Sequence, residues 1–256
     1  MIKIRGREIS QEHRPFIIAE LSANHDGSLE RAKQTIDAAK AAGAHAVKIQ
    51  SYTPDTMTIE CSKKDFTINQ GLWKGYSLYQ LYSLAQTPFE WHQELFDHAK
   101  KSGIPLFSTP FDESAVELLE RLETPAYKIS SFEITDIPLI KVIAQTKKPV
   151  LMSTGMATLD EVGEAVEAAK SMGNKNIILL HCISSYPASL ESANLQNIAI
   201  LKDRFDLEVG LSDHTVGTTA AAVSIALGAV LIEKHFKLDD NECGPDSSFS
   251  INKSEM

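Results

Sequence analysis

The segment FIIAEL at Phe16–Leu21, followed by LERAKQTIDAAKAA at Leu29–Ala42 and AVKIQ at Ala46–Gln50, decides the fold. The two short apolar runs are typical of buried strands, and the stretch between them has the apolar spacing of a helix. Such a run occurs eight times along the chain: Phe16–Leu21, Ala46–Gln50, Pro105–Pro110, Ala126–Ser131, Pro149–Thr154, Ile177–Ser184, Glu208–His214 and Val230–His235. Alternating strands and helices predict a parallel sheet, and eight units are the number that closes a barrel. We therefore predict an α/β fold, a (β/α)8 TIM barrel.

Further helical patterns follow several of these runs: Glu90–Lys101, Ser114–Arg121, Leu159–Ser171 and Gly217–Leu227. The runs themselves end in polar or charged residues: Glu20, Lys48, Thr109, Lys128, Ser131, Ser153, His181, Ser184, Ser212, His214, Glu233 and His235. In a closed barrel the carboxyl ends of the strands meet at one mouth, where the active site is built. The pattern therefore predicts an enzyme.

Composition limits the partners. The 256 residues are 43% apolar, which suits one domain with one large core. The formal net charge of −9 argues against nucleic acid or an anionic membrane, since both attract basic surfaces. The longest apolar stretch, Ala220–Ile232, is too short to cross a bilayer. Cys61, Cys182 and Cys243 are odd in number and lack metal-site spacing, which fits a reducing compartment, so we expect a cytoplasmic protein.

One connection is much longer than the others. Residues 51–87 separate the second strand from its helix and carry Trp73, Tyr79 and Tyr82. A loop of this length is usually functional, so we expect a substrate lid or a subunit contact. The alternative is a small helix, Leu78–Ala85, packed on the barrel rim.

The last residues also depart from the pattern. Phe249–Met256 has the character of a final helix that starts and stops. An eighth helix normally covers the last and first strands of the barrel. We therefore expect a barrel truncated before or within its last helix, and a chain that is a piece of a longer protein.

Two histidines end neighbouring strands. His214 and His235 follow the seventh and eighth strands, which adjoin in a closed barrel. Two imidazoles at adjacent strand ends can hold one divalent metal, with carboxylates or substrate oxygens completing its coordination. Manganese, iron, cobalt and zinc suit imidazole better than calcium does. The alternative is that each histidine is a hydrogen-bonded structural residue.

Two lysines share a local pattern. Lys48 and Lys128 end the second and fourth strands, and a lysine in a barrel mouth binds phosphate or carboxylate as a point charge. It forms a Schiff base when its pKa is lowered, or it simply reaches solvent. The matching positions favour anion binding, and hydroxyls that help to bind phosphate occupy the same rim: Thr109, Ser131, Ser153, Ser184 and Ser212. No dinucleotide or P-loop glycine motif is present, so no nucleotide cofactor is expected.

The carboxylates and Cys182 complete the set of candidate residues. Glu20 at the first strand end is a candidate general acid or base, as are Glu133 and Asp246. An acidic residue at this position can instead pair with a nearby lysine. Cys182 has no defined base in the sequence, so we assign it to packing.

Longer motifs recur in order over essentially the whole chain: Ile18–His25, Lys48–Gln50, Phe107–Asp112, Tyr127–Glu133, Ser153–Met156, Gly210–His214 and Ile232–Phe236. With these motifs the chain resembles the sialic acid synthase family, the phosphoenolpyruvate-condensing synthases of nonulosonic acids. Within that family, Gly71–Gly75, Leu78-Tyr79, Thr87–His92 and Cys182–Pro187 are similar to the pseudaminic acid synthase branch. Ser184 departs from sialate synthases, which tend to have Asn there.

The resemblance implies an aldol-type condensation of phosphoenolpyruvate with an open-chain N-acetylated amino sugar, in which water adds and phosphate leaves by C–O cleavage. The branch favours 2,4-diacetamido-2,4,6-trideoxy-L-altrose over N-acetylmannosamine as the sugar. Full-length members are homodimers with a C-terminal antifreeze-like domain, which residues 1–256 of this barrel domain do not include.

By the same resemblance, each candidate residue has an implied role. Phosphoenolpyruvate would be held by Lys48, Thr109, Lys128, Ser131, Ser153, Ser184 and Ser212. The sugar would be oriented by Gln50, Glu133, Tyr186 and Asp246. His214 and His235 would carry a divalent metal, Mn2+ in the first place and Mg2+ or Co2+ as alternatives. The catalytic residues would be Glu20, Lys48, Lys128 and Glu233.

Other functions remain open at this point. Within the family these are N-acetylneuraminate or legionaminate synthase. More distant alternatives are a Schiff-base aldolase that uses Lys128 or Lys48, a metal-dependent hydrolase, and a non-catalytic module that binds a sugar or an anion.

Overall fold

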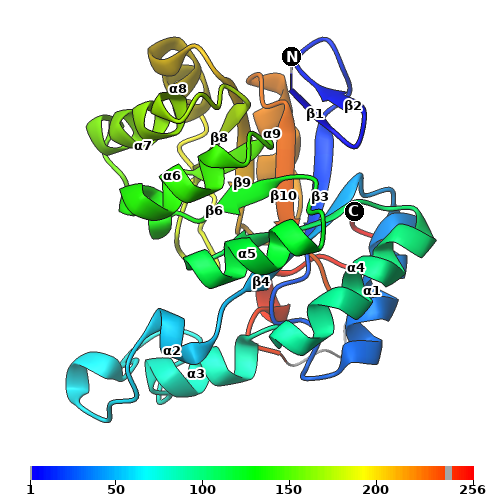
Figure 1. Ribbon diagram of the computed structural model, residues 1–256, viewed down its shortest axis with the longest axis vertical. Coiled ribbons are helices and arrows are strands. Elements are labelled where there is room, and N and C mark those ends of the chain that lie inside the picture. The colour runs from blue at the N-terminus through cyan, green and yellow to red at the C-terminus, as the bar shows by residue number, and fades with distance from the viewer. Residues whose placement is uncertain (1, 240–243) are drawn as a thin grey trace.

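The computed structural model describes residues 2–239 and 244–256 (Figure 1). In these parts of the chain, eight parallel strands close into a barrel, and the last strand pairs with the first. The barrel strands are β3 (Phe16–Glu20), β4 (Ala46–Ser51), β5 (Leu106–Pro110), β6 (Tyr127–Ile129), β7 (Val150–Ser153), β8 (Ile177–Cys182), β9 (Glu208–Asp213) and β10 (Leu231–His235). The predicted (β/α)8 barrel is confirmed.

Helices surround the barrel, as Figure 1 shows: α1 (Leu29–Ala42), α4 (Phe89–Ser102), α5 (Glu113–Arg121), α6 (Ile137–Gln145), α7 (Leu159–Ser171), α8 (Asn197–Phe205) and α9 (Thr219–Ala226). The sequence patterns did not single out α6 and α8. Local capping defines several helix starts; Thr158 and Glu161, for example, form a reciprocal capping box at the start of α7. Among residues 2–239 and 244–256, no helix is long and apolar enough to cross a membrane.

The period of two along each strand explains how the barrel separates core from site. Inward residues of the lower layers, such as Phe16, Ile18, Phe107 and Leu180, form one buried apolar cluster inside the barrel. Two positions after the last apolar inward residue of a strand, a polar residue usually follows: Glu20 follows Ile18, and Thr109 follows Phe107. Because alternate side chains of a strand point to the same face, this change from apolar to polar places most of the strand-end groups in one mouth, whereas His181 lies outside the cavity, with its Nε2 2.7 Å from the carbonyl oxygen of Ala193.

A small hairpin closes the opposite end of the barrel. Strands β1 (Ile2–Ile4) and β2 (Arg7–Ile9) pair antiparallel ahead of β3. Their buried side chains Ile2, Ile4 and Ile9 belong to the same apolar cluster as the barrel interior. The amino-terminal end of the barrel is therefore filled, and the polar groups gather at its carboxyl end.

The long connection between β4 and α4 projects from the barrel (Figure 1). It contains the short helix α2 (Pro54–Met57), a 3-10 turn η1 (Lys64–Phe66) and helix α3 (Leu78–Ala85). Helix α3 has the bounds of the small helix that the sequence offered as the alternative. The ring of its Tyr82 packs edge-on against Tyr52 at the barrel rim, with 5.7 Å between centroids.

The predicted final helix at Phe249–Met256 is wrong, because residues 249–256 contain no α-helix. Phe249 ends the 3-10 turn η3 (Ser247–Phe249), and Ile251 forms a parallel bridge with Phe236. Asn252 and Glu255 then make reciprocal side-chain to backbone hydrogen bonds, the pattern of a helix amino terminus. Phe249 and Ile251 are both buried, and their separation of two residues is the spacing of an extended segment. Cys243, one of the three cysteines in the sequence, lies outside the described residues.

Candidate active site

The strand ends enclose a narrow cavity of about 50 Å³ at the carboxyl end of the barrel. Its lining includes most of the predicted site residues: Glu20, Lys48, Gln50, Thr109, Lys128, Ser131, Ser153, Tyr186, Ser212, His214, Glu233 and His235. Phe111, Ser130 and Cys182 also line it, although the sequence analysis gave them no role in the site. Phe111 lies two residues after Thr109, and Ser130 two after Lys128, so strand alternation was the signal that could have found them.

Four buried charged groups form the floor of this cavity. Lys48 Nζ lies 2.5 Å from Glu20 Oε2 and 3.9 Å from Glu233 Oε1. Lys48 also donates a hydrogen bond of 2.9 Å to Thr109 Oγ1. The fourth group, Lys128, donates to the carbonyl of Ile129 at 2.8 Å. The two lysines and the two carboxylates thus lie together out of contact with solvent.

Their surroundings change the proton affinities of these groups. Burial raises the pKa of Glu20, and Glu233 adds to this while Lys48 opposes it. Burial alone would raise the pKa of Glu233 too, but Lys48 and Lys128 lower it overall. Burial alone would lower the pKa of Lys48, but the two glutamates raise it. For Lys128 burial lowers the pKa, helped by the charge of Lys48. Glu20 is therefore the carboxyl suited to carrying a proton, whereas Glu233 stays ionised.

Hydroxyl groups form one wall of the site. Ser212 Oγ donates to Glu233 Oε1 at 3.2 Å, and Ser131 Oγ accepts from the Gly155 amide at 3.1 Å. In the described part of the chain, the buried Ser153 Oγ has no hydrogen-bond partner. Such an orphaned hydroxyl beside two lysines is what a bound anion would satisfy.

Ser184 lies just beyond β8 and does not line the cavity. It is nevertheless near, because a Cβ placed on Gly155 would meet Ser184 Oγ at 2.6 Å and Ser131 Oγ at 3.0 Å. The same Cβ would lie 2.8 Å from the carbonyl oxygen of Cys182, so the backbone of Gly155 is packed tightly against its neighbours and only glycine fits here without moving the hydroxyls.

The two histidines adjoin as predicted, with ring centroids 5.3 Å apart. His214 Nδ1 lies 2.9 Å from the carbonyl oxygen of Ile183, so this nitrogen carries the proton and Nε2 is left as an acceptor. His235 Nδ1 is buried with no hydrogen-bond partner in the described residues, 3.8 Å from Asp246 Oδ2. Burial lowers the pKa of His235 well below its usual value, and the nearby His214 and Lys48 lower it further.

These properties fit a divalent metal. A neutral imidazole with an unsatisfied buried nitrogen is the form that binds metals, and a carboxylate lies beside it. In the part of the chain that the structure describes, however, no three His, Cys, Asp or Glu side chains are clustered as a preformed metal site. Water or substrate oxygens would therefore have to complete the coordination.

Cys182 borders the cavity beside one of the two histidines. Its Sγ lines the cavity and lies 3.8 Å from His214 Nδ1. Burial alone would raise the pKa of this thiol, but His214 and Ser131 lower it overall. The fold thus brings a histidine that is distant in sequence next to Cys182, whose assignment to packing stays a prediction.

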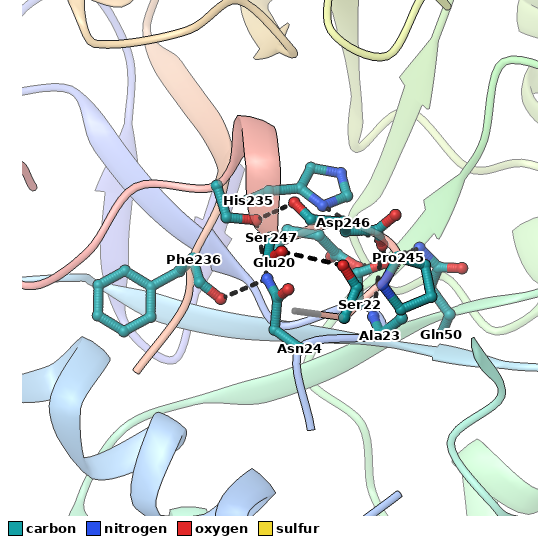
Figure 2. A network of polar contacts seen from close by, with 12 residues as sticks. Glu20, Ser22, Ala23, Asn24, Gln50, His235, Phe236, Pro245, Asp246 and Ser247 are labelled. Atoms are coloured by element: carbon teal, nitrogen blue, oxygen red, sulfur yellow. Dashed lines mark hydrogen bonds and ion pairs between the residues drawn. The ribbon is translucent and has the colours of Figure 1, made fainter. Parts of the chain in front are cut away.

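A polar network joins one side of the cavity to the loop after β10, as Figure 2 shows. Gln50 Nε2 donates to Glu20 Oε1 at 3.2 Å, and Asp246 Oδ2 accepts from Ser22 Oγ at 2.5 Å. Asp246 does not line the cavity itself, but it is buried next to His235. Burial raises the pKa of Asp246, against the effect of its hydrogen bond from Ser22.

Glu133 lies apart from this network. It is in the 3-10 turn η2 (Glu133–Thr135) and accepts a hydrogen bond from Ser130, which lines the cavity. Burial raises its pKa to about 7, although Lys128 lowers it. Glu133 therefore borders the site through Ser130 and does not line the cavity.

Aromatic side chains cover the histidines. The ring centroid of Tyr186 lies 4.4 Å from that of His214 and 5.6 Å from that of Trp73. Trp73 comes from the long connection between β4 and α4, and its Nε1 donates to the carbonyl of Pro245 at 3.0 Å. The long connection therefore reaches across the mouth of the barrel. The cavity of about 50 Å³ below it is much smaller than a usual ligand pocket, which has roughly 300–1,000 Å³.

The buried lysine and carboxylate groups, the hydroxyl wall and the histidine pair lie together at the carboxyl strand ends, where barrel enzymes have their active sites. Comparison with known proteins narrows this class. The NeuB family matches residues 35–256. Pseudaminic acid synthase of Campylobacter jejuni is 49% identical over 94% of this chain and 70% of its own length. N,N'-diacetyllegionaminic acid synthase of the same organism is 41% identical over 94% of this chain and 73% of its own.

A solved structure of a related protein has the same fold over nearly the whole chain. The N-acetylneuraminic acid synthetase of Leptospira borgpetersenii superposes with a TM-score of 0.89 at 31% identity, covering 99% of this chain and 84% of that one. The chain belongs to the NeuB family.

Proposed function

We propose that this protein is a pseudaminic acid synthase. It condenses phosphoenolpyruvate with 2,4-diacetamido-2,4,6-trideoxy-L-altrose and water, and it forms a nine-carbon 2-keto sugar acid and phosphate. One observation carries the proposal: the buried Lys48, Lys128, Glu20 and Glu233 converge in the barrel mouth. The higher identity to the pseudaminic than to the legionaminic acid synthase supports this choice of sugar.

Phosphoenolpyruvate carries a phosphate and a carboxylate, and two anion-binding lysines are available. Lys48 and Lys128 would neutralise its charge, and Thr109 beside Lys48 would add a hydrogen bond. The hydroxyl wall would hold the phosphate: Ser131, Ser153, Ser184 and Ser212. In this arrangement the lysines also stabilise the charge that passes to the leaving phosphate.

The carbon nucleophile is C3 of phosphoenolpyruvate itself, so the protein need not supply one. C3 forms a bond to the aldehyde carbon of the sugar, a water oxygen bonds to C2, and the C2–O bond to phosphate breaks. The aldehyde oxygen becomes a hydroxyl with one proton that the water gives up, and the other water proton leaves with the phosphate as the C2 keto group forms. Glu20, whose pKa burial raises, takes the proton that the water gives up, while Glu233 keeps Lys48 and Lys128 charged and oriented. The rate enhancement then rests on positioning and charge neutralisation.

His214 and His235 would hold a divalent metal, Mn2+ in the first place and Mg2+ or Co2+ as alternatives. When bound, the metal would polarise the sugar aldehyde as a Lewis acid. Asp246, Gln50, Tyr186 and Glu133 surround this side of the site and would orient the sugar.

The wider context belongs to the same proposal. We infer that the enzyme acts in the cytoplasm as a homodimer, together with an antifreeze-like domain in the full-length protein. Of the described cysteines, Cys61 and Cys182 form no disulfide, which agrees with a reducing compartment. The segment 51–87 would act as the lid, since Trp73 already contacts Tyr186 and Pro245.

Two measurements test the proposal. Calorimetric titration of phosphoenolpyruvate with and without Mn2+ should show binding that tightens with the metal. Phosphate release should then depend on the diacetamido sugar and exceed that with N-acetylmannosamine. Release without any amino sugar, or no binding of phosphoenolpyruvate in either condition, would contradict the proposed function.

A Schiff-base aldolase is the second candidate, because burial lowers the pKa of Lys128 and lowered lysines form imines. Borohydride in the presence of a keto acid would trap such an imine as a covalent adduct on Lys128. A condensing synthase forms no imine, so unmodified Lys128 with sugar-dependent phosphate release excludes the aldolase. Binding of phosphoenolpyruvate without any phosphate release would instead indicate a non-catalytic module.

A further inference from the structure

Ser22 has an unusual backbone conformation for its residue type. It lies two residues after the end of β3, it is buried, and its φ is 46°. This left-handed region favours glycine, and other residues keep it mainly where surrounding interactions require it, often at functional sites. A glycine would satisfy the backbone here, so the presence of a serine points to its hydroxyl.

The Ser22 hydroxyl joins two of the groups on the sugar side of the site (Figure 2). It donates to Asp246 Oδ2 at 2.5 Å and accepts from Gln50 Nε2 at 3.0 Å. Gln50 Nε2 gives its other hydrogen to Glu20 Oε1 at 3.2 Å. A continuous series of hydrogen bonds therefore runs from Glu20 through Gln50 and Ser22 to Asp246.

This series determines which groups are left for a ligand. Both amide hydrogens of Gln50 and the Ser22 hydrogen are used inside it, so the Gln50 amide cannot turn over without losing two bonds. In the described residues, the hydrogen bonds to the Asp246 carboxylate are made by Oδ2. Gln50 Oε1 and Asp246 Oδ1 remain, and both are acceptors.

We propose that Ser22 is a positioning residue that selects the sugar by holding Gln50 and Asp246 as a pair of acceptors. The ligand class that satisfies two fixed acceptors is a sugar with amide N–H and hydroxyl donors, such as an acetamido sugar. A buried polar site of this kind discriminates against ligands that leave its groups unpaired. This inference rests on the proposed synthase function and adds the origin of its sugar specificity.

The test compares Ser22→Gly with the wild type in the full-length enzyme. Glycine adopts the observed φ without strain, so a purely structural role predicts unchanged or better function and stability. If the Ser22 hydroxyl positions Gln50 and Asp246 as proposed, Ser22→Gly raises KM for the diacetamido sugar about 10- to 100-fold, which is the effect of losing a hydrogen bond to a charged group. KM for phosphoenolpyruvate stays within about twofold, because Lys48 and the hydroxyl wall do not contact Ser22.

The ratio of kcat/KM for the diacetamido sugar over N-acetylmannosamine should also fall about tenfold or more in this variant. The matched control is Ser250→Ala. Ser250 is buried in the loop that carries Asp246, and its Oγ accepts a hydrogen bond from Asn24 Nδ2 at 2.8 Å. This hydroxyl donates to the backbone carbonyl of Asp246 and not to its carboxylate. This control should lower Tm and leave the sugar ratio unchanged.

The outcomes are distinguishable. If the wild type condenses the sugar and Ser22→Gly has the same KM for the sugar and the same specificity ratio as the wild type, the proposed role of Ser22 is wrong, but the proposed function stands. Equal rises in both KM values also overturn it, since they indicate general disruption of the site. A wild type that releases no phosphate with any amino sugar overturns the proposed function, and the inference with it.

Discussion

Replacing Lys48 by methionine should destabilise the fold strongly and in a pH-dependent way. The side chains of Lys48 and Glu20 are 4% and 1% exposed, so the variant leaves Glu20 and Glu233 buried without their main partner. Removing one member of a buried ion pair costs about 3–5 kcal/mol. At about 2–4 °C per kcal/mol for a chain of this size, Tm should fall by roughly 6–20 °C near neutral pH.

The pH dependence follows from the carboxylates. The pKa of Lys48 is raised in the folded state, so the stability that its ionisation contributes is fully present below the ordinary lysine pKa of 10.5. That contribution is therefore constant between about pH 5 and 8. Without Lys48, whose charge lowers both, the pKa values of Glu20 and Glu233 rise in the folded state. The folded state then binds more protons than the unfolded one, so stability is lost as pH rises. The loss of stability in Lys48→Met should therefore be larger at about pH 8 than at about pH 5.

Thermal unfolding followed by circular dichroism at both pH values measures this. Lys33→Met is the matched control, because Lys33 pairs with Glu94 at the surface, where such a pair contributes about 1 kcal/mol or less. The double variant Glu20→Gln with Lys48→Met should recover part of the stability, because one buried charge is gone. A Lys48→Met variant no less stable than the control, or equally destabilised at both pH values, would refute the reasoning.

Three further predictions concern the metal ligands, the pH dependence of stability and the binding of phosphoenolpyruvate. His214→Ala and His235→Ala should each weaken Mn2+ binding about 10-fold or more in calorimetry, while metal-free binding of phosphoenolpyruvate stays within about threefold; unchanged Mn2+ affinity would exclude them as ligands. Burial raises the pKa of Glu133 to about 7, so the ionisation of Glu133 lowers the stability of the protein as pH rises from 4.5, its ordinary pKa, through 7. Glu133→Gln should therefore reduce the decline in the free energy of unfolding, measured by urea titration, over that pH range; the same decline in the wild type and the variant would contradict this. Gly155→Ala should weaken binding of phosphoenolpyruvate about 10-fold or more, since its Cβ would come within 2.6 Å of Ser184 Oγ and would push the hydroxyl wall out of place, whereas Gly163→Ala, with 3.7 Å of room in a helix, should leave binding unchanged; equal effects would argue against a role of the hydroxyl wall in binding.

The strand order and the inward groups were predictable because they depend on local patterns. Ile18 and Glu20 share a strand face by the period of two, and the same rule places Lys48 and His235 in the mouth once the barrel closes. The helix start expected at Phe249 failed, because Ile251 finds a partner in Phe236 that sequence spacing cannot show. Helix α3 was visible as an alternative, since Leu78–Ala85 carries its own helical pattern.

The sequence by itself determined the barrel, the side of the barrel on which chemistry occurs and the residues that meet there, because strand periodicity and the closed topology convert order along the chain into order around a ring. Only the tertiary structure decided the contacts that tune those residues. Cys182 lies beside His214, and Ser22 joins Gln50 to Asp246, over sequence separations that no local pattern spans. Hydrogen bonds and pKa values depend on distances of a few ångströms and on burial, and folding alone sets both.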